Sequence, residues 1–215
     1  MRMKGPALLT HPNPLIRALA GWLVGMVVFV VAWALSYALL PEGFFGFFPR
    51  MGAVSADVGQ GILSLAWEIF VNNIFVNAVV IGLASLLAMG CISGGYLIAW
   101  FVCGSYGGML GTNSFTYPDP GGPMAPYLAV IWERSGTREI TAYLLTAAAL
   151  ANIHLWRDPS LRSSRLERVR RLREVRLSLG EILLVVVAVL LIAWGAYVEA
   201  WQIVHSPSAF VGERS

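Results

Sequence analysis

Long apolar runs constrain this chain more than any other feature of its sequence. The first extends from Ala18 to Leu40 without a charged residue and ends at Pro41. A helix needs about 20 mainly apolar residues to cross a bilayer, so this run predicts a membrane-spanning helix. Of the 215 residues, 57% are hydrophobic and 13% are charged, whereas soluble domains have about 45–50% and about 25%. We therefore expect lipid to be the main solvent.

Further apolar segments complete a predicted all-α fold, a polytopic membrane helix bundle with about five transmembrane helices. The four additional spans are Ile74 to Met89, Gly94 to Gly111, Ile140 to Trp156 and Leu177 to Val204. An amphipathic helical lead-in over residues 55–71 precedes the second span and could be continuous with it. The whole chain, residues 1–215, is interpreted as a single integral-membrane domain.

Two shorter apolar segments are predicted to enter the membrane region without crossing it. The aromatic stretch Gly43–Pro49 is too short to span, and its phenylalanines favour a place in the headgroup layer. Met124–Glu133 has about half of a spanning length, which predicts a half-helix. A polar hinge, Glu133–Glu139, separates this segment from the fourth span.

Basic residues set the expected orientation. Arg157–Arg176 holds eight arginines against three acidic residues, and its leucines and valines favour a basic amphipathic helix. The positive-inside rule assigns this loop to the cytoplasm, and Arg2, Lys4 and Arg17 agree with that assignment. The expected location is the cytoplasmic membrane of a bacterium or archaeon, with a cytoplasmic N-terminus and an external C-terminus.

Two kinds of ligand would suit the basic loop. An arginine-rich amphipathic segment between two spans typically contacts anionic lipid headgroups, and nucleic acid is the less favoured alternative. The arginines assigned to headgroup contact are Arg165, Arg168, Arg170, Arg171 and Arg173. We therefore expect anionic lipids, and not nucleic acid, among the partners.

Glycines recur four residues apart in the predicted helices. This spacing lets helix backbones approach closely where lipid supplies no hydrophobic drive between them. The glycines assigned to helix packing are Gly21, Gly25, Gly104, Gly108 and Gly111. Packing within the chain is the favoured interpretation. In the alternative, the Gly21/Gly25 face of the first helix binds a partner together with the aromatic residues 44–48.

Polar side chains at membrane depth are expected to be paired, because a charge at the bilayer centre costs about 2.5–3.5 kcal/mol on insertion scales. They gather at the hinge and near the outer ends of the second and fifth spans. The predicted polar cluster comprises Glu68, Asn72, Asn73, Asn77, Arg134, Arg138, Glu139 and Glu199. An arginine of the hinge would neutralise Glu139 or Glu199, with asparagines of the second span supplying hydrogen bonds.

At these residues the chain resembles the stage II sporulation protein M family, whose members combine an F-x-N-N-like segment, an N-G-x-x-x-G segment, an H-G-x-x-E segment and a terminal helix with a glutamate. The similar segments here are Phe70–Asn73, Cys103–Gly108, Ser135–Glu139 and Ala196–Trp201. Cys103 stands where the family has Asn, and Ser135 where it has His. The resemblance implies a non-enzymatic membrane protein that organises partner proteins.

Nothing in the sequence predicts an enzyme, a metal site or a bound cofactor. No Ser/His/Asp order, HExxH, CxxC, phosphate-binding glycine loop or carboxylate pair is recognisable. Cys91 and Cys103 lack metal-ligand spacing. The favoured function is a non-catalytic scaffold or accessory subunit that binds other membrane subunits or forms a homo-oligomer.

Two alternatives stay open. A membrane component of a transporter or channel is motivated by the half-helix and the polar hinge, since broken helices can line solute paths. A cofactor-binding protein is the weaker alternative, because it depends only on histidines and aromatic residues at the membrane boundaries.

Overall fold

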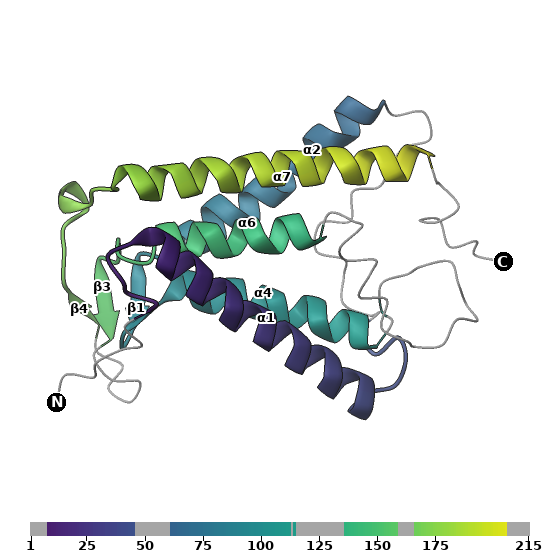
Figure 1. Cartoon of the computed structure of the whole chain (residues 1–215), viewed down its shortest axis with the longest axis horizontal. Helices are drawn as coiled ribbons and strands as arrows, with labels where there is room; N and C mark the ends of the chain where they lie inside the picture. The colour runs from purple at the N-terminus through teal and green to yellow at the C-terminus, as the bar shows by residue number, and fades with distance from the viewer. Residues whose placement is uncertain (1–7, 46–60, 113, 115–135, 159–165, 206–215) are drawn as a thin grey trace.

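The computed structural model describes residues 8–45, 61–112, 114, 136–158 and 166–205. Within these residues the chain is mostly helical, as the apolar runs predict. The helices run along the long axis of the molecule, and a small sheet lies at one end of it (Figure 1). The strands are only two or three residues long, so helix packing sets the architecture.

Three helical segments are long and apolar enough to cross a membrane: Pro14–Leu39, Ile62–Ala84 and Leu179–His205. The first is α1 and the last is α7. The middle one consists of α2 (Ile62–Ile74), the π-helix η1 (Phe75–Ile81) and α3 (Gly82–Ala84), which follow one another without a break. These three segments are consistent with a membrane protein.

Two more helices coincide with predicted spans, but neither is both long enough and apolar enough to be a candidate membrane span by the same criteria. Helix α4 occupies Gly94–Gly111, the predicted bounds, and has 18 residues. Helix α6 occupies Gly136–Ala149 and has only 14 residues. At about 1.5 Å per residue, α6 extends for about 21 Å, which is less than the roughly 30 Å of a hydrocarbon core.

The predicted second span, Ile74 to Met89, was placed too far along the chain. The helix begins at Ile62, so the lead-in and the span are one element, and it ends at Ala84. Leu87–Met89 instead forms strand β1, which turns through Gly90 (φ +63°) into strand β2, Ile92–Ser93. Backbone pairing in this hairpin, rather than side-chain polarity, ends the helix.

The prediction of a basic amphipathic helix over Arg157–Arg176 was wrong for the residues that the structure describes. Strand β3 (Trp156–Asp158) pairs parallel to β1, and β4 (Glu167–Arg168) pairs antiparallel to β3. A 3-10 turn, η2, follows at Leu172–Glu174. The sheet order is β2-β1-β3-β4, so partners 69 residues apart override the local helical pattern.

Helix α6 lies at the centre of the bundle, where it packs against α1, α4, α7 and η1 (Figure 1). Nine of its 14 residues are buried, including Tyr143, Leu144 and Ala147. The exposed large apolar residues of α1 and α7, such as Leu23 and Leu190, point away from the core. Small side chains on α6 therefore let longer helices surround it closely.

The predicted packing glycines lie inside the chain. A Cβ on Gly21 would overlap Tyr96 of α4, and one on Gly25 would come within 2.9 Å of Leu144 of α6. The docking alternative for the Gly21/Gly25 face was therefore wrong, because α4 and α6 of the same chain occupy it.

On α4, the glycine face meets α1. Gly108 packs against Ser36 and Phe45, and a Cβ on Gly111 would overlap the backbone of α1 at Trp33. Gly104 has more room, with Val28 Cγ1 at 3.4 Å from the position of an added Cβ. The favoured interpretation, close packing within the chain, therefore describes these glycines.

Several predicted segments lie outside the described residues. These are the half-helix Met124–Glu133, the first part of the lead-in and residues 46–49 of the aromatic stretch. Phe44 and Phe45 are described, and the Phe45 amide donates a hydrogen bond to Ser114 Oγ at 3.0 Å.

Alanine should have different effects on stability at two glycines that lie one turn apart on α4. In Gly107→Ala the new Cβ would overlap the Phe29 carbonyl, so we expect a loss of about 1–3 kcal/mol in unfolding free energy. In the control Gly104→Ala the Cβ meets only Val28, and the effect should be near zero. Denaturant unfolding in detergent micelles measures both. Equal effects would mean that α1 and α4 are not in close contact.

Candidate functional site

The predicted polar cluster centres on the carboxylate of Glu139, in the first turn of α6. Its side chain is buried, with 4% exposed. Asn73 Nδ2 of α2 donates a hydrogen bond to Oε1 at 2.7 Å, and the Tyr106 hydroxyl of α4 donates one to Oε2 at 3.1 Å. The Tyr143 hydroxyl of α6 donates to Asn73 Oδ1 at 3.4 Å. We call these four residues the Glu139 cluster.

Helical periodicity explains how the cluster forms. On α2, Asn73 follows Leu65 and Ile69 at four-residue intervals, so it lies on the buried face that packs against the other helices. On α6, Tyr143 is one turn from Glu139 and shares its face. Each oxygen of the buried carboxylate thus receives a donor, which offsets part of the cost of removing it from water.

The structure brings together only some of the predicted cluster. Asn73 contacts Glu139, and Asn77 is buried one turn further along the same face. Glu68 is exposed and Asn72 is half-buried, on a different face of α2, so these two do not join the Glu139 cluster. Neighbouring asparagines in a helix point about 100° apart, which separates Asn72 from Asn73.

The remaining charged residues of the predicted polar cluster are Arg138, Glu199 and Arg134. The Arg138 guanidinium lies over the ring of Trp194 of α7, 5.3 Å from its centroid. Glu199 of α7 is half-buried and lies within electrostatic range of both Tyr106 and Tyr143. Arg134 lies outside the described residues, and the predicted contact of Arg134 or Arg138 with Glu139 or Glu199 stays a prediction.

Sequence reasoning missed the two tyrosines of the Glu139 cluster. Tyr143 carried a usable signal, because it stands four residues after a glutamate in an otherwise apolar helix. Tyr106 had a weaker one. It belongs to the segment that resembles the sporulation family, but a tyrosine near a membrane boundary is ordinary in an aromatic belt.

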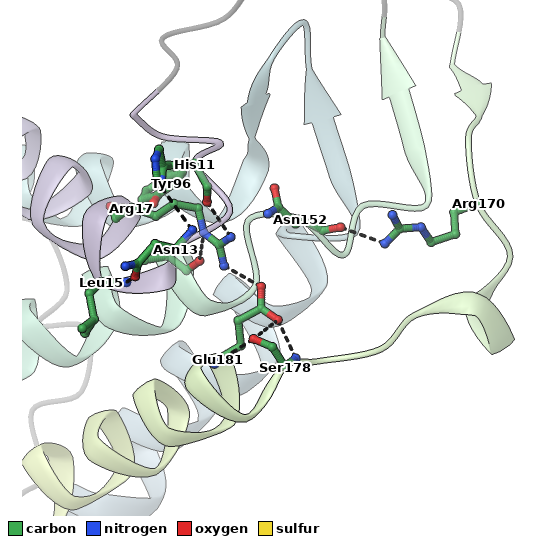
Figure 2. Close-up of polar contacts among 10 residues, drawn as sticks. His11, Asn13, Leu15, Arg17, Tyr96, Asn152, Arg170, Ser178 and Glu181 are labelled. Atoms are coloured by element: carbon green, nitrogen blue, oxygen red, sulfur yellow. Dashed lines mark hydrogen bonds and ion pairs between the residues drawn. The ribbon is translucent and has the colours of Figure 1, made fainter.

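A second buried polar centre lies at the opposite end of the bundle, beside the small sheet (Figure 2). The Arg17 side chain of α1 is fully buried, and its NH2 nitrogen forms an ion pair with Glu181 Oε1 of α7 at 2.5 Å. Its Nε donates to the Ala148 carbonyl of α6 at 3.1 Å, and its NH1 to the His11 carbonyl at 2.9 Å. One side chain therefore joins four segments.

The start of α7 holds the Glu181 carboxylate in place for this contact. The Ser178 amide and hydroxyl donate to Glu181 Oε2 at 2.7 and 2.9 Å, and the Glu181 amide donates to Ser178 Oγ at 3.3 Å (Figure 2). This is the reciprocal pattern of a capping box. The pattern leaves Oε1 for Arg17, and the negative charge is favourable at a helix N-terminus.

The basic segment surrounds the same end of the bundle. Arg157 Nε donates to the Gly90 carbonyl at 2.6 Å, and Arg170 NH1 donates to the Asn152 carbonyl at 2.9 Å. The Arg168 guanidinium lies 5.7 Å from the centroid of the Trp156 ring. Arg171 and Arg173 are exposed, and Arg165 lies outside the described residues. Three of the five predicted headgroup arginines, Arg168, Arg171 and Arg173, are thus exposed.

His154 lies in the turn after α6, beyond the last helical residue. Burial, together with the nearby positive charges of Arg157 and Arg170, holds the pKa of its imidazole below the usual value. The histidine is therefore neutral at pH 7, and the positive charge of this end comes from arginine. That charge does not change across the physiological pH range.

The described side chains of these two centres make hydrogen bonds and one ion pair. Among the described residues, no three His, Cys, Asp or Glu side chains come together in a way that could hold a metal ion. The two carboxylates at the two ends accept hydrogen bonds from protein donors. Comparison of the chain with protein-family models, with curated proteins and with solved structures finds no match.

Two phenols near Glu139 should differ in their contribution to stability. The Tyr106 hydroxyl bonds to the carboxylate at 3.1 Å, so Tyr106→Phe should lower the unfolding free energy by about 1.5–3 kcal/mol. Tyr143→Phe removes a longer bond to a neutral amide, so its loss should be about 0.5–1.5 kcal/mol or less. Denaturant unfolding of both variants tests the order, and a larger effect at Tyr143 would contradict it.

The Arg17–Glu181 pair should show strong coupling in a double-mutant cycle. Each single change, Arg17→Met or Glu181→Gln, should lower stability by about 3–5 kcal/mol because it leaves a buried polar partner. The double variant should lose much less than the sum. Glu181→Gln should be the more harmful single change, because the Arg17 side chain is 1% exposed and that of Glu181 is 10% exposed. Additive losses would show that the pair is not formed.

Proposed function

We propose that this chain is a non-catalytic integral-membrane scaffold or accessory subunit of a larger membrane complex. The observation that carries the proposal is one lateral face of α2. Trp67, Val71 and Phe75 are exposed there, and they line a shallow hollow together with Glu68 and Asn72. We call these five residues the α2 face.

The α2 face combines features that lipid alone does not suit. The opposite side of the same helix packs on α7, through Leu65 and Ile69 against Ala196 and Ala200. Glu68 lies about 9 Å along the helix from Ile62, within a segment that is long enough to span. The face thus combines exposed aromatic residues with polar side chains, and polar side chains on membrane helices commonly bond to a neighbouring helix.

The chemistry of the α2 face specifies its partner. The occupant that fits best is a transmembrane helix of another protein. Its apolar residues would pack between Trp67 and Phe75. Such a contact replaces the docking surface on α1 that the glycine spacing suggested, because that surface is filled by α4 and α6.

A five-span topology supports the same function. In it α1, the α2–α3 segment, α4, α6 and α7 all cross the membrane, with the sheet and the arginine-rich segment in the cytoplasm. The chain would then belong to a bacterial or archaeal cytoplasmic membrane. Most of the described residues are helical, which leaves little room among them for an extramembrane catalytic domain.

The resemblance to the stage II sporulation protein M family points in the same direction, because it implies a protein that organises others. Glu139 and Asn73, which stand in two of the similar segments, are in contact with each other. Exposed Arg171 and Arg173 would bind anionic headgroups at the cytoplasmic surface.

A transporter or channel component is the second candidate. The observation that favours it is the buried polar row of Asn73, Asn77 and Glu139 inside a bundle of membrane-length helices. Five spans are few for a complete transport path, so a transporter would need further subunits, and the α2 face would serve that assembly as well.

Site-specific photo-crosslinking tests the proposal. A benzophenone amino acid at Trp67 or Phe75 should give a discrete protein adduct in native membranes, because a partner helix covers the α2 face. The same probe at Val27, a 62% exposed residue of α1, is the control and should give no such adduct. Mass spectrometry identifies the adduct.

The adduct also separates the two kinds of partner. A different membrane protein would support the accessory-subunit function, whereas a second copy of this chain would assign the α2 face to a homo-oligomer. Crosslinking to lipid alone at positions 67 and 75 would refute a protein partner on this face.

A further inference from the structure

Two buried polar atoms, one on η1 and one on α6, make no hydrogen bond within the described part of the chain. They are Asn77 Oδ1 on η1 and Thr146 Oγ1 on α6. The residues are 2% and 3% exposed. Buried polar side-chain atoms nearly always have a partner, and an unsatisfied one costs about 1–3 kcal/mol. Two such atoms in one helix contact need a common explanation.

The topology places these two residues at a similar level of the bundle. Both η1 and α6 lead toward the sheet, where β1 follows the first and β3 the second, in parallel pairing. The two helical segments are therefore parallel neighbours that pack against each other. Asn77 lies one turn beyond Asn73, and Thr146 lies one turn beyond Tyr143, while Tyr143 donates to Asn73. Asn77 and Thr146 therefore lie one turn beyond the Asn73–Tyr143 pair along the same two helical segments.

Local structure makes room at this level. The turns of η1 are π-helical, which is wider than an α-helix, and such turns occur frequently at functional sites. The neighbours of Thr146 along α6 include Ala142, Ala147 and Ala149, all with small side chains. A wide turn opposite an alanine-rich helix suits a ligand of very small size.

We propose that Asn77 and Thr146 form a buried hydration site between η1 and α6. A water molecule there donates one hydrogen bond to Asn77 Oδ1 and accepts one from the Thr146 hydroxyl, so both orphaned atoms are satisfied. Water suits the site better than a metal cation does. Glu139 is seven residues, or about 10 Å, from Thr146 along α6, so no carboxylate of that helix can join the site.

The hydration site extends the Glu139 cluster toward the middle of the bundle. The resulting row of hydrogen-bonding groups runs from Glu139 and Asn73 through Tyr143 to Asn77 and Thr146. Nearer the sheet, the hydroxyl of Ser85, which follows α3, bonds to the Ile81 carbonyl.

Nuclear magnetic resonance of the full chain in deuterated detergent tests the site directly. With the Thr146 methyl group labelled, water bound beside it should give a water-to-methyl cross-peak. The variant Asn77→Leu should abolish that cross-peak. The control Val79→Leu, at an exposed position of the same helix, should retain it.

Thermal unfolding supplies an independent readout. A bound water makes the two residues depend on each other, so Asn77→Leu and Thr146→Val should each lower the unfolding midpoint, and the double variant should lose less than the sum. If the site is dry, each change removes an orphaned polar group, and both single variants should raise the midpoint. A missing cross-peak in the unaltered protein, or higher midpoints for both single variants, would overturn the proposal.

Discussion

The guanidinium group of Arg17 is the constraint on which the arrangement of the bundle depends. A fully buried positive charge is tolerated only when it is paired and its N–H groups are bonded. Here each nitrogen of the group has a different partner, on α6, on α7 and on the segment before α1. Moving any of these elements would leave a donor or the charge itself without compensation, so the contact specifies position as well as adding stability.

The rest of the bundle can be understood as a close-packed layer between two polar ends. Glycines of α4 bring its backbone against α1, and the alanines of α6 let α7 and α1 close around it. Aromatic donors lock the α1–α4 contact further, since Tyr96 and Trp100 bond to the Arg17 and Gly21 carbonyls. The interior of the described bundle is thus filled by the chain's own apolar side chains.

The apolar runs predicted α1, α4 and α7 to within a few residues, because helices in lipid must satisfy their backbone internally over a known length. The sequence predicted α6 but placed its end too far along the chain, because the apolar residues after Ala149 continue into the turn and strand β3. The sheet could not be predicted. Its strands are two or three residues long, and β1 meets a partner 69 residues away, so no local pattern marks them.

The polar sites show the same division: residues that stand out in a local sequence pattern were predicted, and a pair distant in sequence was not. Asn73 and Glu139 were selected because a carboxylate and an amide stand out in apolar helices, and the structure brings these two together. Arg17 was counted only as a marker of orientation. Its partner is 164 residues away in sequence, and Glu181 resembles an ordinary helix-capping residue.

That distance has a consequence for the order in which the protein is made. A ribosome releases α1 first and α7 last, so Arg17 enters the membrane boundary long before Glu181 exists. Until then the arginine must remain at the aqueous surface, and α6, short and polar at its first turn, lacks the helix that covers it. The Arg17–Glu181 contact of the native bundle is therefore completed only on arrival of its final segment.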